Sequence, residues 1–301
     1  MIEAMGLAER LGRFGIWAGQ LSWLPYAGQA KVLPEIEAAG FGTLWYGESV
    51  GREAFAMGAI MLAKTKQLNV ASGIANIYAR DPMAMANGAR ALEQAWPGRF
   101  VLGLGVSHAP MVEGRGHHYR KPVTTMADYL DRMEQAPWRG PETAMPPVVL
   151  AALGPKMLEL AARRSAGAHP YFVPVEHTRR ARDILGEGPL LAPEQAVVFA
   201  SSRNEALEIA RNYMRTYLSL PNYRNNLVRM GWKDEDLNAD TPGADLLDAV
   251  VAWGDEDAIG ERIQQHLAAG ADHVAVQPLT ADPDEPYVEE IRRLGRVIEK
   301  L

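Results

Sequence analysis

The sequence predicts an α/β fold of the (β/α)8 TIM barrel class, with insertions between strands. Short apolar runs alternate with longer segments of helical periodicity along the whole chain, and strands that alternate with helices pair in parallel. About eight such units can be counted, as in a closed barrel, whereas a doubly wound sheet has fewer. No low-complexity linker divides the 301 residues, so we expect a single domain over 1–301.

The first four units are the most regular. The helical pattern after the first strand closes on Gly40, a typical C-terminal stop. Asp81 and Pro82 predict the start of the helix after the third strand, because Asp caps free amides and proline fits the first helical turn. The strands expected in this half are 13–19, 43–49, 68–76 and 100–107, and the helices are 31–40, 52–65, 81–98 and 124–135.

The second half repeats this alternation less clearly. The helix after the fifth strand should stop at Gly167, and one long helical stretch should run from Ser202 to about Met230. Residues 137–147 and 232–243 are expected to be irregular loops. The remaining strands are expected at 147–153, 168–173, 190–200 and 272–279, and the remaining helices at 155–167, 175–188, 255–270 and 285–301.

Composition narrows the class of function. The net charge of −6 with no basic block argues against a nucleic-acid partner. The chain has no cysteine, which excludes thiolate catalysis, disulfides and cysteine-ligated metals, and fits a cytoplasmic location. No signal peptide is evident, and no apolar run approaches the roughly 18 residues of a membrane-spanning helix. We therefore expect a cytoplasmic protein whose partner is a small molecule.

In a barrel, functional residues gather at the carboxyl ends of the strands. The fourth strand ends in GLGVSH, which resembles a dinucleotide fingerprint but has His108 in place of the third glycine and no helix directly after it. Gly103 and Gly105 instead fit a strand whose backbone is crowded by a neighbour or a ligand. Ser107 and His108 could then contact a phosphate at the rim, or simply end the strand.

Two other strand ends are unusual. Small residues lead to Gly73 in the third strand and leave room for a flat ligand, with Ile74 as an apolar wall and Asn76 as an amide partner. An ordinary packed strand end is the alternative. After the fifth strand, which ends at Ala152 and Leu153, Gly154 and Pro155 begin a helix whose free amides would suit an anion.

Several side chains allow two interpretations. Glu48, at the end of the second strand, could be a general acid or a hydrogen-bond anchor, and Trp17 could be an aromatic wall or packing. His177 precedes three arginines that we expect mainly on a solvated helix face. The basic loop at 114–121 suits an acidic ligand tail. Adjacent histidines in this loop do not suit a metal, and no metal-site spacing occurs elsewhere.

Taken together, the chain resembles the luciferase-like oxidoreductases, specifically the branch that uses the deazaflavin coenzyme F420. The resemblance rests on FGIW, LWYGES, VASGIAN, GRFVLGLGVSH, LAALGPKMLELAA, GAHPYFVPVEHT and VAWGDEDAI. It implies a homodimer and a non-prolyl cis peptide at Gly73–Ile74 that backs the deazaflavin ring. It also implies phosphate contacts at Ser107–His108 and Gly154–Pro155. The cofactor-binding residues would be Trp17, Gly73, Ile74, Asn76, Ser107, His108, Ala152, Leu153, Gly154 and Pro155.

One departure from the resemblance bears on the reaction. Relatives that oxidise sugar phosphates or alcohols carry an Asp-His pair after the second strand, where this chain has Glu48 and Ser49. We therefore expect hydride transfer between F420 and a small organic substrate, with Glu48 or His108 handling the proton and with Ser49, Tyr171 and His177 near the substrate. The alternatives are an FMN-dependent luciferase-like monooxygenase and a non-catalytic F420-binding protein. A barrel hydrolase is disfavoured, since no metal cluster or nucleophile elbow is present.

Overall fold

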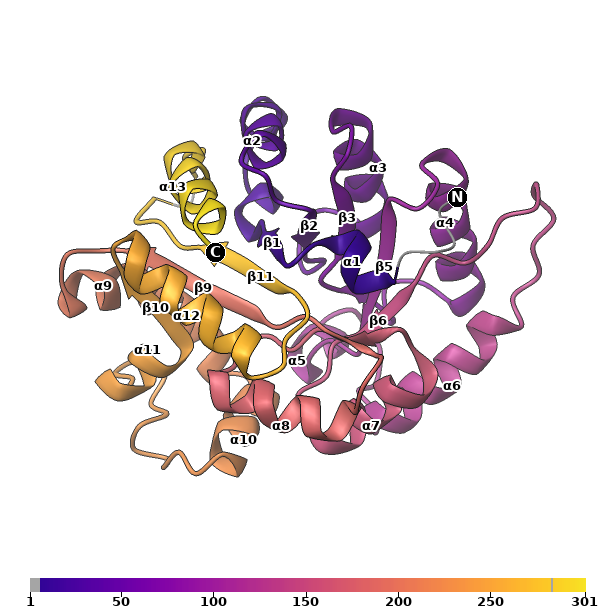
Figure 1. Cartoon of the computed structure of the whole chain (residues 1–301). Helices are drawn as coiled ribbons and strands as arrows, with labels where there is room; N and C mark the ends of the chain where they lie inside the picture. Colours follow the sequence, from indigo (N-terminus) through magenta and orange to yellow (C-terminus); the bar gives the residue numbers. More distant parts are fainter. Residues whose placement is uncertain (1–5, 283) are drawn as a thin grey trace.

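The computed structural model describes residues 6–282 and 284–301, and its central feature is a curled parallel sheet surrounded by helices (Figure 1). All strand pairs are parallel, and the order runs β10-β9-β11-β1-β2-β3-β5-β6-β7-β8, with β4 beside β5. The strands are β1 Phe14–Trp17, β2 Thr43–Tyr46, β3 Asn69–Ser72, β4 Ala75–Asn76, β5 Phe100–Gly105, β6 Val148–Leu150, β7 Gly167–Ala168, β8 Leu190–Leu191, β9 Glu194–Phe199, β10 Val251–Gly254 and β11 Val274–Pro278.

The sheet closes because β8 and β9 are two parts of one strand, separated only by Ala192 and Pro193. On one side, the amide of Ala192 donates to Ala168 O of β7 at 2.9 Å. On the other side, Pro193 O accepts from the amide of Ala275 in β11, also at 2.9 Å. The structure is thus the (β/α)8 barrel that the sequence predicts, with β4 continuing β3 and β10 added beside β9.

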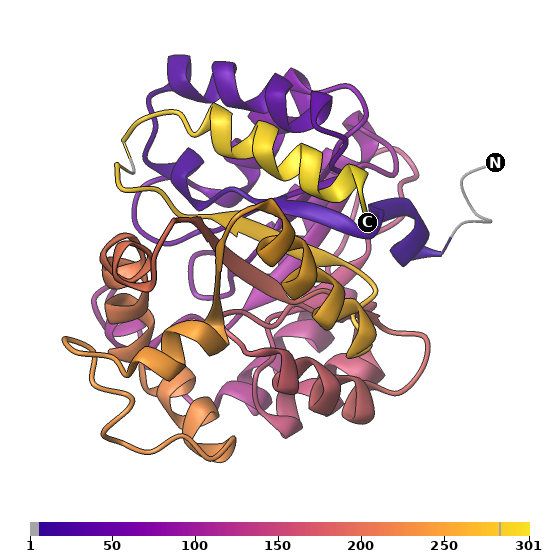
Figure 2. The ribbon, with the colours of Figure 1, turned by 60° about the vertical axis from the view of Figure 1, so that its left-hand side comes forward.

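Helices cover the outside of the barrel, and the insertion between β9 and β10 forms a separate group at one side, coloured orange in Figure 1. Figure 2 shows the same group from another direction, below the barrel strands. The helices are α1 Leu7–Leu11, α2 Tyr26–Ala38, α3 Ala54–Lys64, α4 Pro82–Ala95, α5 Ala109–Glu113, α6 Pro122–Glu134, α7 Pro155–Arg164, α8 Val175–Leu185, α9 Arg203–Leu218, α10 Pro221–Arg229, α11 Ala244–Val250, α12 Glu256–Ala268 and α13 Val288–Glu299, with a short 3-10 turn at Gly19–Ser22. Within the described residues, no helix combines the length and the apolar character needed to cross a membrane.

The expected start of α4 is confirmed, since the Asp81 carboxylate accepts hydrogen bonds from the amides of Met83 and Ala84. Several boundaries were wrong. α2 begins at Tyr26, not at residue 31, and α5 begins directly after His108, where no helix was expected. α7 ends at Arg164, because Gly167 belongs to β7 and leaves no room for a side chain: a Cβ on this glycine would lie 2.1 Å from Leu190 O. The sixth strand covers only Gly167–Ala168, not 168–173. The helical stretch after Ser202 breaks before Pro221 into α9 and α10.

Side chains that alternate along each strand point outward or inward and so build two separate hydrophobic clusters. Ile16, Leu44 and Val70 point outward and pack in one cluster with the helices. Trp17 and Trp45 lie in a second cluster that fills the barrel. Trp17 is the last residue of β1, so the upper layer of the barrel filling also forms the floor of the candidate site.

Candidate functional site

The glycines of β5 accommodate the neighbouring strand. The Gly73–Ile74 peptide bond is cis, as the resemblance implies. A Cβ on Gly103 would lie 1.8 Å from Ser72 O, and a Cβ on Gly105 would lie 2.5 Å from the Ile74 side chain. Backbone crowding by a neighbour, one of the two expected causes, therefore explains both glycines. Their role is to seat the bulge between β3 and β4, and the resemblance of GLGVSH to a dinucleotide fingerprint is coincidental.

Aromatic and amide side chains from several strands meet above this bulge. The Trp17 ring lies beside Gly73, with its Nε1 2.8 Å from where a Cβ of Gly73 would be, and its centroid is 5.0 Å from that of Tyr171. The Tyr171 hydroxyl donates to Gln277 Oε1 at 2.6 Å. Trp17 and Tyr171 are each 8% exposed, so the expected wall forms, and it is already closely packed.

A buried histidine that the sequence analysis missed fixes this wall. His169 Nδ1 donates to Ala192 O at 2.6 Å, which leaves Nε2 to accept from Trp17 Nε1 at 3.2 Å. Its ring stacks on Trp45, with centroids 4.3 Å apart. Burial lowers the pKa of His169 to about 4, so the imidazole is neutral and serves as an acceptor. The only sequence signal was its place directly after the small residues of the sixth strand.

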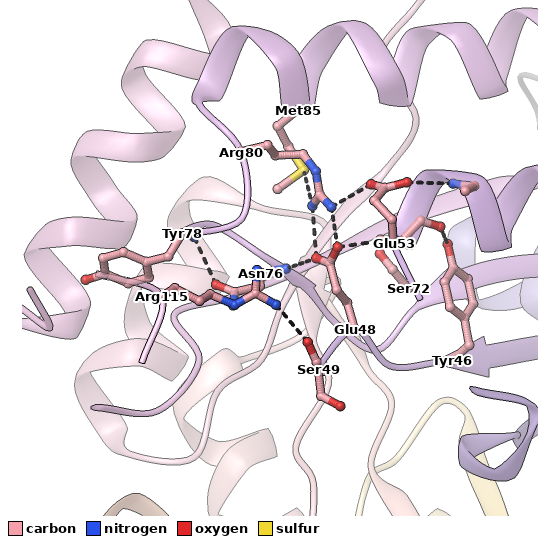
Figure 3. Close-up of polar contacts among 12 residues, drawn as sticks. Tyr46, Glu48, Ser49, Glu53, Ser72, Asn76, Tyr78, Arg80, Met85 and Arg115 are labelled. Carbon is pink, nitrogen blue, oxygen red and sulfur yellow. Dashed lines mark hydrogen bonds and ion pairs between the residues drawn. The ribbon is translucent and has the colours of Figure 1, made fainter. Parts of the chain in front are cut away.

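The Glu48 carboxylate is surrounded by hydrogen-bond and ion-pair partners (Figure 3). Its carboxylate accepts from the amides of Ala54 and Asn76 at 3.1 and 2.8 Å, and it forms a two-pronged ion pair with Arg80. The Glu48 side chain is only 4% exposed. Burial opposes the charge of Arg80, but the hydrogen bond and attraction of Glu48 outweigh it and raise the pKa of Arg80. Of the two roles expected for Glu48, the geometry therefore favours the hydrogen-bond anchor over the general acid.

Arg80 was not among the site residues predicted from the sequence. Its guanidinium also pairs with Glu53 at 2.6 Å and lies over the Phe55 ring, 5.1 Å from the centroid. These contacts join the end of β2 to the loop before α4 (Figure 3). Sequence reasoning overlooked Arg80 because a single arginine before an N-cap resembles a solvated side chain.

Asn76 is the clearest sign of an unsatisfied group in the expected cofactor site. It is fully buried, and its Oδ1 accepts from the amide of Tyr78 at 2.9 Å. Its Nδ2 has no hydrogen-bond partner among the described residues. Buried amide donors are rarely left unpaired, so this atom fits a ligand that brings an acceptor, such as a ring carbonyl.

Ser49 takes part in the site through its backbone. The side chain is exposed, whereas its carbonyl accepts from Arg115 Nη2 at 2.7 Å. Arg115 belongs to the basic loop 114–121, and Figure 3 shows its side chain reaching past Asn76 toward Ser49. This loop thus lies against the carboxyl ends of β2 and β4.

The two expected phosphate-binding turns have suitable backbone arrangements. Ser107 adopts a positive φ of 57°, and the half-buried His108 places Nδ1 3.0 Å from Asn222 Oδ1. Burial lowers the pKa of His108, and the Asn222 hydrogen bond offsets part of this effect. Gly154 is the N-cap residue of α7 and Pro155, which has no amide hydrogen, is its first residue. The amides of Met157 and Leu158 donate to Gly154 O, both at 3.1 Å, so the amide of Lys156 is the one in this turn that the described residues leave available to an anion.

His177 lies beneath the second of these turns. It is 3% exposed, and its Nε2 donates to Leu153 O at 2.8 Å, while Nδ1 has no partner among the described residues. Burial is the main cause of its lowered pKa, and Arg229 and Arg180 lower the pKa further. His177 was expected near the substrate, and the structure brings it to Ala152, Leu153 and Gly154 at the end of the fifth strand.

Tyrosines from the insertion contact the barrel at a buried carboxyl group that the sequence analysis also missed. Glu194 is 1% exposed, and its oxygens accept from the amide of Phe172 and the hydroxyl of Tyr213, all at 3.1 Å. Burial raises the pKa of Glu194 to about 8. The Tyr217 hydroxyl donates to Tyr171 at 3.0 Å, so α9 is tied to the wall of the site.

Comparison with known proteins finds relatives that span most of the chain. A Mycobacterium tuberculosis protein, assigned by its name to the coenzyme F420-dependent oxidoreductases, is 25% identical over 98% of this chain and 100% of its own length. A 5,10-methylenetetrahydromethanopterin reductase of Archaeoglobus fulgidus is 24% identical over 86% of this chain and 83% of its own.

Solved structures with the same fold use two different cofactors. An F420-dependent secondary alcohol dehydrogenase, in complex with an F420-acetone adduct, has a TM-score of 0.74 at 16% identity, covering 95% of this chain and 98% of its own. The oxygenating constituent of a diketocamphane monooxygenase from Pseudomonas putida, in complex with FMN, has a TM-score of 0.70 at 17% identity and covers 96% of both chains. The model of the luciferase-like monooxygenase family matches residues 7–273, so this chain belongs to that enzyme family.

Proposed function

We propose that this protein is an F420-dependent oxidoreductase that transfers a hydride between the coenzyme and a small organic substrate. The observation that carries the proposal is the free, buried Nδ2 of Asn76 beside the cis Gly73–Ile74 bulge, at the carboxyl ends of the strands, where the described residues offer it no acceptor. The names of relatives that span nearly the whole chain support the deazaflavin in particular.

The residues present fit such a cofactor. Gly73, Ile74 and Trp17 would contact the ring, and Asn76 Nδ2 would donate to a ring oxygen. Ala152, Leu153, Gly154 and Pro155, with the backbone amides of Ser107 and His108, would hold the phosphate, which leaves the His108 imidazole free for another role. When bound, the coenzyme supplies the hydride, and the protein contributes binding, orientation and exclusion of water.

Three side chains would position the loops and handle protons. Glu48 and Arg80 fix the loop ends beside the bulge, because every strong contact of the Glu48 carboxylate is internal. We assign proton handling to His108, whose Nδ1 is occupied by Asn222 and whose Nε2 is the nitrogen left to exchange a proton. Its lowered pKa keeps the ring neutral near pH 7, so it begins the cycle as a base. Ser49 and Tyr171 would border the substrate.

The second candidate is an FMN-dependent monooxygenase, favoured by the name of the family model and by the FMN-containing neighbour. A parallel titration of the purified protein with F420 and FMN, followed by fluorescence, separates the two. Saturable binding of F420 with weak FMN binding supports the oxidoreductase. The reverse preference contradicts it in favour of oxygen chemistry, and tight F420 binding without turnover on a broad substrate panel favours a binding protein. The homodimer and the cytoplasmic location also stay proposals, and light scattering in solution tests the first.

A further inference from the structure

Helix α10 connects the two turns that were expected to bind phosphate. Near its start, Asn222 contacts His108, and the Tyr223 ring lies 5.6 Å from the His108 ring. At its end, the Arg229 guanidinium lies over Gly154: a Cβ on that glycine would be 3.4 Å from Arg229 Nη2. Nine helical residues span about 13 Å, so one short helix borders the exit of β5 and the start of α7 together.

The charge of Arg229 has no internal partner. Among the described residues, no carboxylate lies within ion-pair distance of its guanidinium, whereas the neighbouring Arg180 pairs with Glu176. Arg229 is exposed, and its contact with Arg180 uses the backbone, since Arg180 Nη1 donates to Arg229 O at 3.4 Å. A free guanidinium beside the positive end of a helix, where the Lys156 amide has no acceptor among the described residues, concentrates positive potential at one point.

A second group at the same turn is incomplete. His177 is fixed through Nε2 on Leu153 O, one residue before Gly154, and its buried Nδ1 lacks a partner in the described part of the chain. Because Nε2 donates and burial keeps the ring neutral, Nδ1 is an acceptor, which an ordered water can complete but a phosphate oxygen cannot. The anion-binding groups at this turn are therefore the helix start and the unpaired guanidinium, with the neutral His177 holding the turn from below.

We propose that Arg229 binds the phosphate of the cofactor, and that α10 forms the third wall of the phosphate site. The insertion between β9 and β10 would then contribute directly to cofactor binding, and the phosphate would join it to α7. This inference rests on the proposed function only in placing a phosphate at Gly154. It holds for F420 and for FMN alike, since both carry one.

The test compares ligands that differ in the phosphate. FMN and riboflavin differ only in that group, and F420 is compared with its phosphate-free deazaflavin chromophore. Each is titrated against the wild type, Arg229→Gln, Arg229→Lys and the control Arg211→Gln, which removes the same charge from the exposed face of α9. We expect Arg229→Gln to weaken binding of the phosphate-bearing ligands about 10- to 50-fold and that of the phosphate-free ligands less than about twofold. Lysine should restore part of the loss, and Arg211→Gln should change nothing.

The outcomes separate this inference from the proposed function. Equal losses for FMN and riboflavin, or no loss for either, overturn the role of Arg229 whatever the natural cofactor. A wild type that prefers FMN to F420 contradicts the proposed function, while the FMN and riboflavin pair still decides on Arg229. A wild type that gains no affinity from the phosphate overturns the inference directly.

Discussion

Replacing Gly154 with Asp should have opposite effects on cofactor affinity and on protein stability. Gly154 has φ −87° and ψ 157°, a conformation open to any residue and usual before proline. Its Cβ would be 3.4 Å from Arg229 Nη2, which is the end of a flexible side chain. The new carboxylate would cap the first amides of α7 and pair with Arg229. It would therefore occupy with its own charge the place that we assign to the phosphate.

The two magnitudes follow from the same geometry. Asp in place of Gly at an N-cap adds a few tenths of a kcal/mol, and an exposed ion pair adds about 0.2–1 kcal/mol, so unfolding should require about 0.5–1 kcal/mol more. Like charges about 5 Å apart repel by roughly 3 kcal/mol at an effective permittivity near 20. Solvent at this half-exposed turn reduces that to about 2 kcal/mol, which corresponds to about 30-fold weaker binding of a phosphate-bearing cofactor.

Thermal unfolding and fluorescence titration measure the two effects, with Gly154→Ala as the control that adds the Cβ without the charge. We expect the alanine variant to bind within about threefold of the wild type, since Arg229 can move aside. Unchanged FMN and F420 affinity in Gly154→Asp would refute the phosphate assignment. An equal loss for riboflavin would show a general distortion of the turn instead.

Three further predictions concern the groups around the barrel mouth. Glu48→Gln should lower the free energy of unfolding by about 3 kcal/mol in chemical denaturation, because Arg80 keeps its charge, loses its buried partner and retains only the half-exposed Glu53; a loss below about 1 kcal/mol would contradict the anchor role. Asn76→Ala should weaken F420 and its phosphate-free chromophore alike, about 10-fold, with Asn204→Ala on α9 as the control; an effect confined to phosphate-bearing ligands would place Asn76 away from the ring. Glu194 has its folded pKa raised to about 8, so the folded state binds its proton more tightly than the unfolded state, and stability falls as pH rises from the ordinary carboxyl pKa toward 8. Glu194→Gln should not show this loss. In urea unfolding, the difference in the free energy of unfolding between the variant and the wild type should therefore shift in favour of the variant by up to about 4 kcal/mol from pH 5 to pH 8. An equal difference at both pH values would show that Glu194 does not titrate in this range.

The sequence predicted the barrel because its signals are local. Each strand is a short apolar run, and Asp81–Pro82 specifies a helix start by its own chemistry. Strand ends could also be grouped correctly, since parallel strands bring their carboxyl ends to one rim. Trp17, Gly73 and Tyr171 meet for that reason alone.

The partners of these residues could not be predicted in the same way. Arg80 and Glu48 are 32 positions apart, and His169 lies 152 positions from Trp17. No periodicity links such pairs, and only the closed sheet brings them together. For the same reason the sequence could not decide whether Glu48 is a general acid or a hydrogen-bond anchor. That choice depends on how many donors surround its carboxylate, and the donors come from three different segments of the chain.

The barrel and the insertion contribute different parts of the proposed cofactor site. The ring-binding side is built from strand ends and is rigid, because Gly103 and Gly105 allow Ser72 and Ile74 to approach β5 without space for a Cβ. The phosphate side is completed by α10, which is tied to the barrel through Asn222 and, by way of α9, through Tyr213 and Glu194. Variation in the insertion can therefore alter phosphate affinity and the substrate wall while the bulge that supports the ring stays fixed. A single family fold can in this way host cofactors that share a phosphate and differ in their ring chemistry.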